Sequence, residues 1–256
     1  MWKSIRIFLL LLVLAVVAIQ TWRDRVETRS WREPLWAGIF PLNGDGTARS
    51  QSYIEALSPQ DLAPIAEFFQ REAHRYGVSV EEPVHIELYP PGKELPPALP
   101  RDASTLGIAW WSLKLRWYAL HASAAPGRAP ARIRLFVLYH DPATLGVAPD
   151  SHGLQKGLVG VVHVFANPDM NGSNDVVIAH ELLHTVGATD KYDLATGAPL
   201  FPGGYGDRAR VPLYPQVQTE IMAGRRPISP HVFEMPRSLR EVVVGPETAQ
   251  EIRWTH

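Results

Sequence analysis

The sequence predicts an α+β fold of three layers: a mixed β-sheet between helices, followed by a loop-rich C-terminal subdomain. Three observations predict this fold. A helical pattern near residue 60 precedes short apolar runs between residues 84 and 165, a second helical pattern follows near residue 180, and residues 196–236 are rich in Pro, Gly and Tyr with little periodicity. At 256 residues the chain is long enough for one well-filled core.

Charge and cysteine usage exclude several classes of function. The chain carries 25 Lys and Arg against 26 Asp and Glu, so its formal net charge of −1 gives no general affinity for nucleic acid. Cysteine is absent, which excludes disulfide bonds, thiolate zinc ligands and a cysteine nucleophile. Any metal site must therefore use histidine and carboxylate side chains.

Residues 1–22 are predicted to take the chain out of the cytoplasm. Lys3 and Arg6 precede an unbroken apolar run over residues 7–19. A membrane span needs about 20 residues, so this run is short for a span and suits the apolar part of a signal peptide. We favour an uncleaved membrane anchor, with a cleaved signal peptide and secretion as the alternative. Both place the rest of the chain in the periplasm or at the cell surface, because the basic start stays inside.

Residues 23–50 are predicted to be a stalk, and residues 51–256 to form the folded domain. The stalk segment holds charges, tryptophans and a strong turn cluster of Asn, Gly and Asp at residues 43–46. The first helix is expected to begin at Ser58, which is followed by a proline at the first helical position, and to end at Gly77.

Short segments in the first half of the domain have the patterns of β-strands. Residues 84–88 alternate between apolar and polar side chains, which predicts a half-buried strand. Residues 133–139 and 160–165 are apolar runs suited to inner strands. Residues 106–121 are rich in aromatic side chains and ambiguous, but the alternation of apolar and basic residues at 113–117 favours a strand there too.

A second helix is predicted over residues 175–186. Residues 171–174 supply a turn and a cap before it, and Gly187 ends it. Apolar side chains lie on two of its faces, so this helix is expected to be largely buried. After Pro246, residues 247–254 are expected to form a short terminal helix.

The second helix carries His180, Glu181 and His184, a pattern typical of a metal site with a general base. Residues four apart on a helix project from the same face, so both imidazoles can reach one ion. Glu181 lies at the edge of that face, where it can take a proton from a water molecule on the ion without binding the ion. Burying these side chains without partners would be costly, which favours a metal site over a chance match.

A third ligand is expected at Asp190. Gly187 can turn the chain back sharply and bring this carboxylate towards the histidine pair. Asp193 is one alternative, and Glu220, in a segment without a helical pattern, is another. Zinc with three protein ligands keeps one position for water and lowers the pKa of that water to about 7. Iron or another divalent ion would also fit two histidines and a carboxylate.

This segment resembles the extended zinc signature of the metzincin clan of metallopeptidases, in its variant with aspartate as the third ligand. Snapalysin-type peptidases use that variant, and the three residues that follow are similar to the motif tail of immune-inhibitor-type peptidases. The signature spans eleven residues and matches here as His180-Glu181-x-x-His184-x-x-Gly187-x-x-Asp190.

The resemblance implies a site as well as a family. It implies that Zn2+ is bound by His180, His184 and Asp190, with Glu181 as the catalytic residue, and that Met222 forms the methionine turn beneath the metal. The close match covers residues 180–223 only. Residues 51–256 would then be the catalytic domain.

The same resemblance implies how substrate binds. In that family a strand antiparallel to the bound substrate precedes the active-site helix, and residues 161–165 occupy that place here. A peptide would add a strand at this sheet edge. A tyrosine that stabilises the oxyanion would be Tyr192, Tyr205 or Tyr214, and the sequence does not choose among them.

Other conspicuous side chains are assigned ordinary roles. His163 alternates with valines and is interpreted as a solvated or cleft-facing strand residue. The pair at residues 140–141 is interpreted as a turn at a strand end, and His231 as a loop residue. The tryptophans at 110, 111 and 117 are interpreted as core or cleft wall.

These patterns predict a zinc-dependent hydrolase, and the first hypothesis is a metalloendopeptidase that cleaves peptide or protein substrates. The second is a zinc-dependent amidase that acts on cell-wall material, because it needs the same activated water. The third is a non-catalytic, membrane-tethered interaction domain that keeps the ion for stability.

Overall fold

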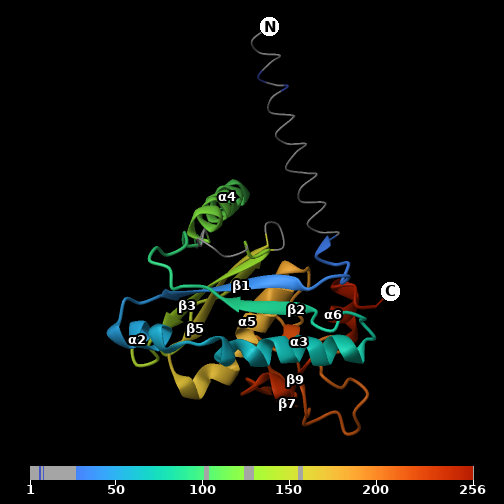
Figure 1. The fold of residues 1–256 in the computed structure, drawn as a ribbon. Helices are drawn as coiled ribbons and strands as arrows, with labels where there is room; N and C mark the ends of the chain where they lie inside the picture. Colours follow the sequence, from blue (N-terminus) through green and yellow to red (C-terminus); the bar gives the residue numbers. More distant parts are fainter. Residues whose placement is uncertain are drawn as a thin grey trace.

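A five-stranded mixed sheet forms the centre of the molecule, and helices cover both of its faces (Figure 1). The computed structural model describes Arg6, Phe8 and residues 27–100, 104–123, 130–154 and 158–255. The strands of the central sheet are β1 (Leu35–Asn43), β2 (Val84–Leu88), β3 (Ile133–His140), β4 (His152–Leu154) and β5 (Val159–Phe165). Their order is β2-β1-β3-β5-β4; the first four are parallel, and β4 runs antiparallel to β5. The predicted α+β class with a mixed sheet is therefore confirmed.

The predicted stalk over residues 23–50 is wrong for its later part. β1 pairs with both β2 and β3 and is buried at nearly every position. A proline is unusual in an inner strand because it has no N–H to donate. The carbonyl of Pro41 accepts a hydrogen bond from the N–H of Gly92 at 3.0 Å, beyond the end of β2. The missing N–H of Pro41 would point to this same side, where β2 has already ended, so the proline is tolerated.

The two faces of the sheet belong to two apolar clusters. Helices α2 (Ala48–Ala56), α3 (Ala63–Arg75) and α5 (Asn171–Thr185) pack on one face, and α4 (Thr105–Ala122) packs on the other (Figure 1). Side chains of a strand point alternately to opposite faces. In β3, Leu135 and Val137 accordingly face the cluster with α3 and α5, whereas Phe136 faces the cluster with α4.

Residues 106–121 form helix α4 and not the strand that was predicted. Trp111, Leu115 and Ala119 are buried at a spacing of four and pack on the sheet. The alternation at 113–117 arises because this helix carries apolar side chains on two opposite sides, with residue 115 inward and residues 113 and 117 outward. A strand and such a helix give the same short alternating pattern.

The interpretation of three tryptophans as core or cleft wall is correct for one of them. Trp111 is buried and its indole N–H donates to the carbonyl of Pro97 at 2.8 Å. Trp110 and Trp117 are 59% and 67% exposed, and neither lines the cleft described below.

The other predicted elements are found with shifted ends. Ser58 begins a short 3-10 turn (Pro59–Leu62) that leads into α3, and its backbone N–H and hydroxyl donate to the Asp61 carboxylate at 2.8 and 2.7 Å. Helix α5 begins at Asn171, so the residues predicted to cap it form its first turn. The strands predicted over 84–88, 133–139 and 160–165 are confirmed as β2, β3 and β5.

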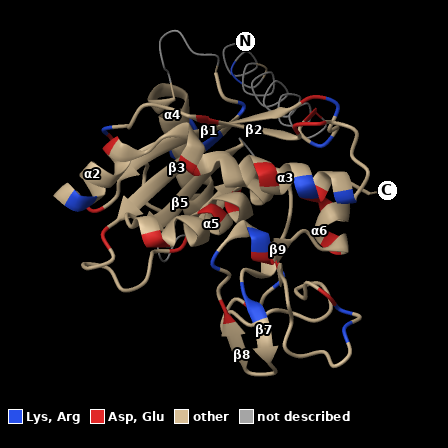
Figure 2. Cartoon of the chain, turned by 60° about the horizontal axis from the view of Figure 1, so that its bottom comes forward, with Lys and Arg blue, Asp and Glu red and all other residues tan. Residues whose placement is uncertain are grey.

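The C-terminal part is loop-rich, as predicted, and contains only short elements. Figure 2 shows its strands β7 and β8 projecting away from the central sheet. The elements are β6 (Thr219–Glu220), a 3-10 turn η3 (Ile221–Ala223), β7 (Arg226–Ser229), β8 (Val232–Glu234), a 3-10 turn η4 (Leu239–Glu241), β9 (Val242–Val243) and helix α6 (Pro246–Glu251).

The predicted anchor or signal segment over residues 1–22 lies outside the described residues, apart from Arg6 and Phe8. Within the parts of the chain that the structure describes, none of the helices is both long enough and apolar enough to cross a bilayer. The localisation and the membrane attachment of the chain therefore stay predictions.

Candidate metal centre

Helix α5 is fixed against the sheet in a single register. Its apolar side chains at Ile178 and Leu182 are fully buried. Asn174 clamps the end of β5, because its side-chain amide donates to the carbonyl of Phe165 at 2.8 Å and its amide oxygen accepts from the N–H of Phe165 at 3.1 Å. Sliding the helix along the strand would break both bonds, so the positions of its histidines are determined.

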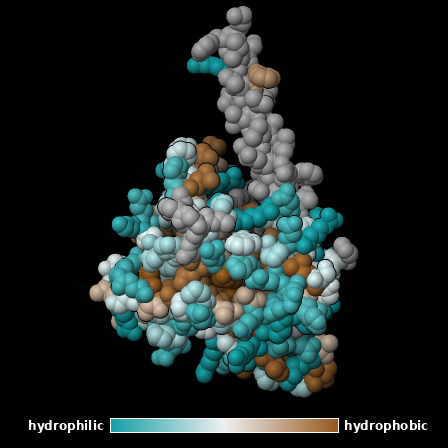
Figure 3. All heavy atoms as spheres, in the orientation of Figure 1, coloured by the Kyte–Doolittle hydropathy of each residue, from teal (hydrophilic) through white to brown (hydrophobic). Residues whose placement is uncertain are grey.

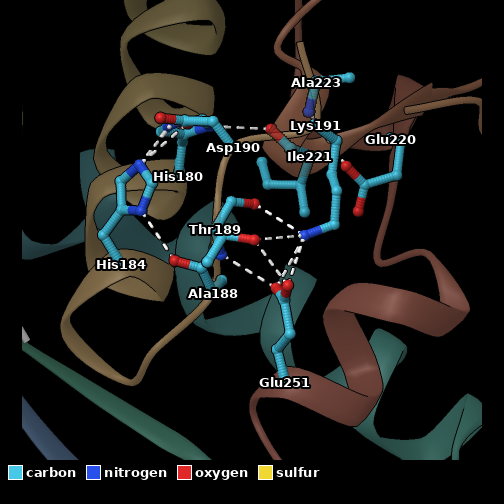
Figure 4. A network of polar contacts seen from close by, with 10 residues as sticks. All are labelled: His180, His184, Ala188, Thr189, Asp190, Lys191, Glu220, Ile221, Ala223 and Glu251. Atoms are coloured by element: carbon cyan, nitrogen blue, oxygen red, sulfur yellow. Dashed lines mark hydrogen bonds and ion pairs between the residues drawn. The ribbon is translucent and has the colours of Figure 1, made fainter. Parts of the chain in front are cut away.

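Three side chains of the predicted site converge on one point (Figure 4). The Nε2 atoms of His180 and His184 are 3.1 Å apart, and Oδ1 of Asp190 lies 3.2 Å from the first and 3.1 Å from the second. Ligand atoms that each lie about 2.0–2.1 Å from a tetrahedral ion are about 3.3–3.4 Å from one another. The triangle is therefore close to the size that a bound divalent ion requires.

The second ring nitrogen of each histidine is held by a backbone carbonyl. Nδ1 of His180 lies 2.9 Å from the oxygen of Ile221, and Nδ1 of His184 lies 2.9 Å from the oxygen of Ala188. A carbonyl only accepts hydrogen bonds, so each Nδ1 donates and each Nε2 turns towards the triangle. This is the tautomer and the orientation that a metal ligand needs.

The triangle requires a positive charge at its centre. Burial alone would raise the pKa of Asp190, but its contacts with both histidines hold that pKa below its ordinary value. Burial opposes protonation of His180, but its contact with Asp190, the charge of Glu181 and the hydrogen bond to Ile221 together raise the pKa of the ring. A divalent ion bound by the same atoms would supply positive charge between them.

Glu181 is buried beside the triangle with one unused oxygen. It is 5% exposed, and its Oε2 has no hydrogen-bond partner in the part of the chain that the structure describes. One carboxylate oxygen lies within 4.8 Å of the ligand atoms of His180 and His184, so the three residues form a group that is compatible with a metal ion. Asp190 makes the shorter contacts to both rings and is therefore the better third ligand. Burial raises the pKa of Glu181.

A tight turn after α5 brings Asp190 back to the histidines. Gly187 has φ +102°, a conformation that side chains disfavour. The N–H of Gly187 donates to the carbonyl of His184 at 3.1 Å, and the N–H of Ala188 donates to that of Leu183 at 3.0 Å. The predicted reversal at Gly187 is confirmed.

Lys191 ties this turn to the terminal helix α6 (Figure 4). Its ammonium group donates to both carboxylate oxygens of Glu251 at 2.8 Å and to the carbonyl of Thr189 at 2.9 Å. The hydroxyl and N–H of Thr189 also donate to Glu251, at 2.6 and 2.9 Å. No sequence pattern pointed to this pair, because its members are 60 residues apart.

Met222, the candidate for the methionine turn, lies fully buried in η3 next to the site. The carbonyl before it, from Ile221, accepts from His180, and its own carbonyl accepts from the N–H of Lys191 at 2.9 Å. The turn therefore contacts both the histidine side and the Asp190 side of the triangle.

Neither alternative third ligand reaches the histidines. The exposed carboxylate of Asp193 accepts hydrogen bonds from its own turn, including the N–H and hydroxyl of Thr196, both at 2.8 Å. Glu220 is fully buried among three donors at 2.7–3.1 Å: the N–H groups of Ala223 and Gly245 and the hydroxyl of Thr248. Of the three candidate carboxylates, Asp190 is therefore the one that contacts both histidines in this structure.

His180, Asp190 and Glu181 form part of the lining of a cleft of about 770 Å³. Of the three candidate tyrosines, only Tyr192 lines this cleft, whereas the hydroxyls of Tyr205 and Tyr214 lie 2.8 Å apart and bind each other. Burial raises the pKa of Tyr192, so its phenol remains a hydrogen-bond donor at neutral pH. Arg225 is the single lysine or arginine among the described residues that line the cleft.

His163 faces the same cleft from β5 and has a partner that was not predicted. Its Nδ1 lies 2.9 Å from Nε2 of His140, and the two rings stack with centroids 5.1 Å apart. Burial, together with the neighbouring histidines, lowers the pKa of His163 to about 4. The pair is therefore uncharged at neutral pH, and the turn predicted at residues 140–141 begins beyond it.

β5, the strand predicted to pair with substrate, is an inner strand of the sheet and not its edge. β5 has β3 on one side and β4 on the other, so β4 is the edge strand. Gly153, in the middle of β4, crosses closely over α5: a Cβ atom there would come within 2.6 Å of the Glu181 carbonyl oxygen and 3.2 Å of its Oε2. A three-residue strand centred on glycine has no recognisable pattern, so the sequence did not predict it.

Comparison with known proteins does not assign a family. No protein-family model matches the chain, and no curated protein matches it. The resemblance to the metzincin signature over residues 180–223 stays a prediction.

Proposed function

We propose that this chain is a zinc-dependent metalloendopeptidase of the metzincin type that acts outside the cytoplasm. The observation that carries the proposal is the convergence of two imidazole nitrogens and the Asp190 oxygen within 3.2 Å, beside the unpartnered oxygen of Glu181. A purely structural cluster would supply donors to its buried acceptors. Oε2 of Glu181 has no hydrogen-bond partner among the described residues.

Zinc fits this donor set best. Two neutral imidazoles and one carboxylate are zinc ligands, and three protein ligands leave the open position that catalytic zinc sites keep. The carbonyls that hold each Nδ1 are the outer contacts that orient metal-binding histidines. Calcium and magnesium are disfavoured because they select oxygen ligands.

The cleft residues divide the steps of amide hydrolysis among them. A bound zinc ion would polarise the scissile carbonyl and lower the pKa of a water molecule at its open position. Glu181 accepts the proton of the attacking water at Oε2 and delivers it to the leaving amine as the C–N bond breaks. Its raised pKa suits a group that must hold the proton between these steps. Tyr192 donates a hydrogen bond to the carbonyl oxygen as negative charge develops there.

A peptide or protein is the proposed substrate class because of the edge strand. Among the described residues, β4 pairs on one side only, with β5. An extended peptide can therefore add to its outer side by main-chain hydrogen bonds. Gly153 leaves no side chain between this strand and α5, which keeps the peptide backbone close to Glu181.

The experiment that tests the proposal is Glu181→Gln in the full chain. The amide keeps the shape of the side chain but accepts no proton, so casein cleavage should fall by about 100-fold to 10,000-fold. Bound zinc, measured by elemental analysis of protein purified without added metal, should stay near the wild-type content, as should the melting temperature. His180→Ala should lose both the zinc and the activity.

Three other outcomes would contradict the proposal. Wild-type protein that releases fragments from peptidoglycan but leaves casein intact would be a cell-wall amidase. If wild type and Glu181→Gln hold zinc and are equally inactive on both substrates, the centre is structural and the chain is an interaction domain. If His180→Ala changes neither zinc content nor activity, no metal is bound at this site.

A further inference from the structure

Helix α4 has a second apolar face that none of the described residues covers. At about 100° per residue, five large apolar side chains fall within an arc of about 80°. We call them the outer stripe; they are 56–82% exposed and are Leu106, Trp110, Leu113, Trp117 and Leu120. The residues that pack on the sheet, Trp111, Leu115 and Ala119, lie on the opposite side of the helix.

The outer stripe is large for the surface of a single chain. Figure 3 shows hydrophobic residues uncovered where α4 protrudes from the body of the molecule. The five exposed side chains present on the order of 600 Å² of apolar surface, and patches of more than a few hundred Å² mark contact sites. Packing on the sheet does not require these residues, because the buried side of α4 supplies that contact alone.

Within α4, the charged side chains that flank the outer stripe are basic. At 100° per residue, Lys114 lies on one side of it and Arg116 on the other, and α4 itself contains no Asp or Glu. Nζ of Lys114 lies 5.6 Å from the ring centroid of Trp110, so its aliphatic stem follows the stripe while its charge reaches past it. A second copy of α4 would bring like charges together without an acidic partner, which disfavours self-association. Anionic lipid headgroups are complementary to these flanks.

We propose that the outer stripe lies in the interface of an anionic lipid bilayer, with α4 parallel to the membrane surface. Exposed tryptophans between leucines are typical of helices at the headgroup level. The helix does not qualify as a span, so it would rest on the bilayer and not cross it. This contact adds to the anchor predicted over residues 1–22: that segment would hold the chain at the membrane, and α4 would fix its orientation. The proposal does not depend on the metal centre.

Single-cysteine labelling tests the proposal, because the natural chain has no cysteine. The full chain would carry an environment-sensitive fluorophore at Leu113→Cys in the outer stripe, or at Val211→Cys, which is 93% exposed in the C-terminal part. Both proteins are reconstituted with vesicles of phosphatidylcholine and phosphatidylglycerol. The label at 113 should shift to the blue and be quenched by nitroxide-labelled lipid at least about threefold more than the label at 211.

Two results would overturn the proposal. In the first, water-soluble iodide quenches the label at 113 as well as the label at 211, which would mean that the stripe stays in water. In the second, the label shifts to the blue but labelled lipid does not reach it, which would mean that protein covers the stripe. Both substitutions replace exposed side chains, and unchanged circular dichroism and melting temperature would show that both variants fold.

Lys114→Glu in the Leu113→Cys protein tests the choice of anionic lipid. Each basic residue near an anionic membrane surface raises the affinity of the protein for that surface about fivefold. Lipid quenching of the label should therefore fall by at least about fivefold in phosphatidylglycerol vesicles. It should stay unchanged in vesicles of phosphatidylcholine alone. Equal quenching before and after the substitution in the anionic vesicles would contradict the assignment.

Discussion

At the scale of single residues, the candidate site depends on which ring nitrogens face the triangle. Nδ1 of His180 and of His184 donate to carbonyls, which leaves both Nε2 atoms and Asp190 to meet. The sequence predicted that these three residues converge, because a helix fixes the histidine spacing and Gly187 permits the return. It could not predict the ring orientations, because one of the carbonyls belongs to a loop 41 residues away.

Asp190→Asn should lower zinc affinity by at least about 100-fold, because a neutral amide oxygen replaces the carboxylate ligand. Asp193→Asn is a matched control: it makes the same change three residues later, on a carboxylate that is exposed and bound within its own turn. Its zinc affinity should equal that of the wild type. Competition with a chromogenic chelator measures both, and a larger loss in the Asp193 variant would assign the third ligand to that residue.

Asp175 gives the fold a pH dependence away from the ligands. Burial, with a smaller contribution from the charge of Asp61, raises the pKa of this carboxyl to about 7. Its folded form binds the proton more tightly than its unfolded form does, so the free energy of unfolding decreases as the pH rises from about 4 to 7.

Asp175→Asn should remove this decrease in the free energy of unfolding with rising pH. The free energy of unfolding at about pH 8 should rise by about 4 kcal/mol, with little change at about pH 3, where the wild-type carboxyl is largely protonated in both states. Denaturant melts in the presence of a chelator measure this without a contribution from metal binding. An equal gain at both pH values would show that ionisation of Asp175 is not the cause.

At the scale of elements, length and regular pattern decided what could be predicted. The apolar run of β3 and the helix with the histidine pair are long, and each has one interpretation. The sequence did not predict β1, because a proline such as Pro41 is unusual in an inner strand. Pro41 is accommodated because β2 ends before it, so no strand residue needs an N–H from Pro41. Helix α4 was mistaken for a strand because two apolar sides of a helix imitate alternation.

Gly153→Ala tests the role of the edge strand. The new Cβ would meet the Glu181 carbonyl and the His184 Cβ at 2.6 Å, and both are rigid parts of α5, so β4 must move outward. We expect the kcat/KM for casein to fall at least about tenfold, because a shift of 1 Å in substrate position is costly to catalysis. Gly146→Ala is the control: no atom lies within 4 Å of its Cβ position, and its activity should be unchanged. Equal activity of both variants would contradict a substrate site at β4.

At the scale of the whole molecule, the C-terminal part supports the candidate site from two directions. Ile221 holds the ring of His180, and Glu251 of α6 holds Lys191, the residue after Asp190. These contacts join segments that are 41 and 60 residues apart, and local patterns carry no information about such pairs. The sequence therefore predicted which residues make up the candidate site, but not the distant contacts that hold those residues in position.

Glu251→Gln should destabilise the fold and loosen the metal loop. Lys191 is buried, so removal of its partner leaves an uncompensated charge and should cost about 3 kcal/mol. For a chain of this size that corresponds to a fall in melting temperature of roughly 6–12 °C. Glu234→Gln, which removes an exposed pair with Arg226, should lower it by less than about 2 °C. Similar falls in the melting temperature of the two variants would show that burial of the Lys191–Glu251 pair adds nothing to the stability of the fold.

The contacts between the helix of the histidines and the C-terminal part span the long loops over residues 196–218. A peptidase that cuts its own exposed loops would meet its first accessible bonds there. Such a nick would not release the C-terminal fragment, because the His180–Ile221 and Lys191–Glu251 bonds lie on both sides of the break and hold the two pieces together. If the proposed activity is correct, the nicked molecule would thus remain one particle with the residues of the candidate site in place, and autolysis in these loops would be visible on a denaturing gel but not by gel filtration.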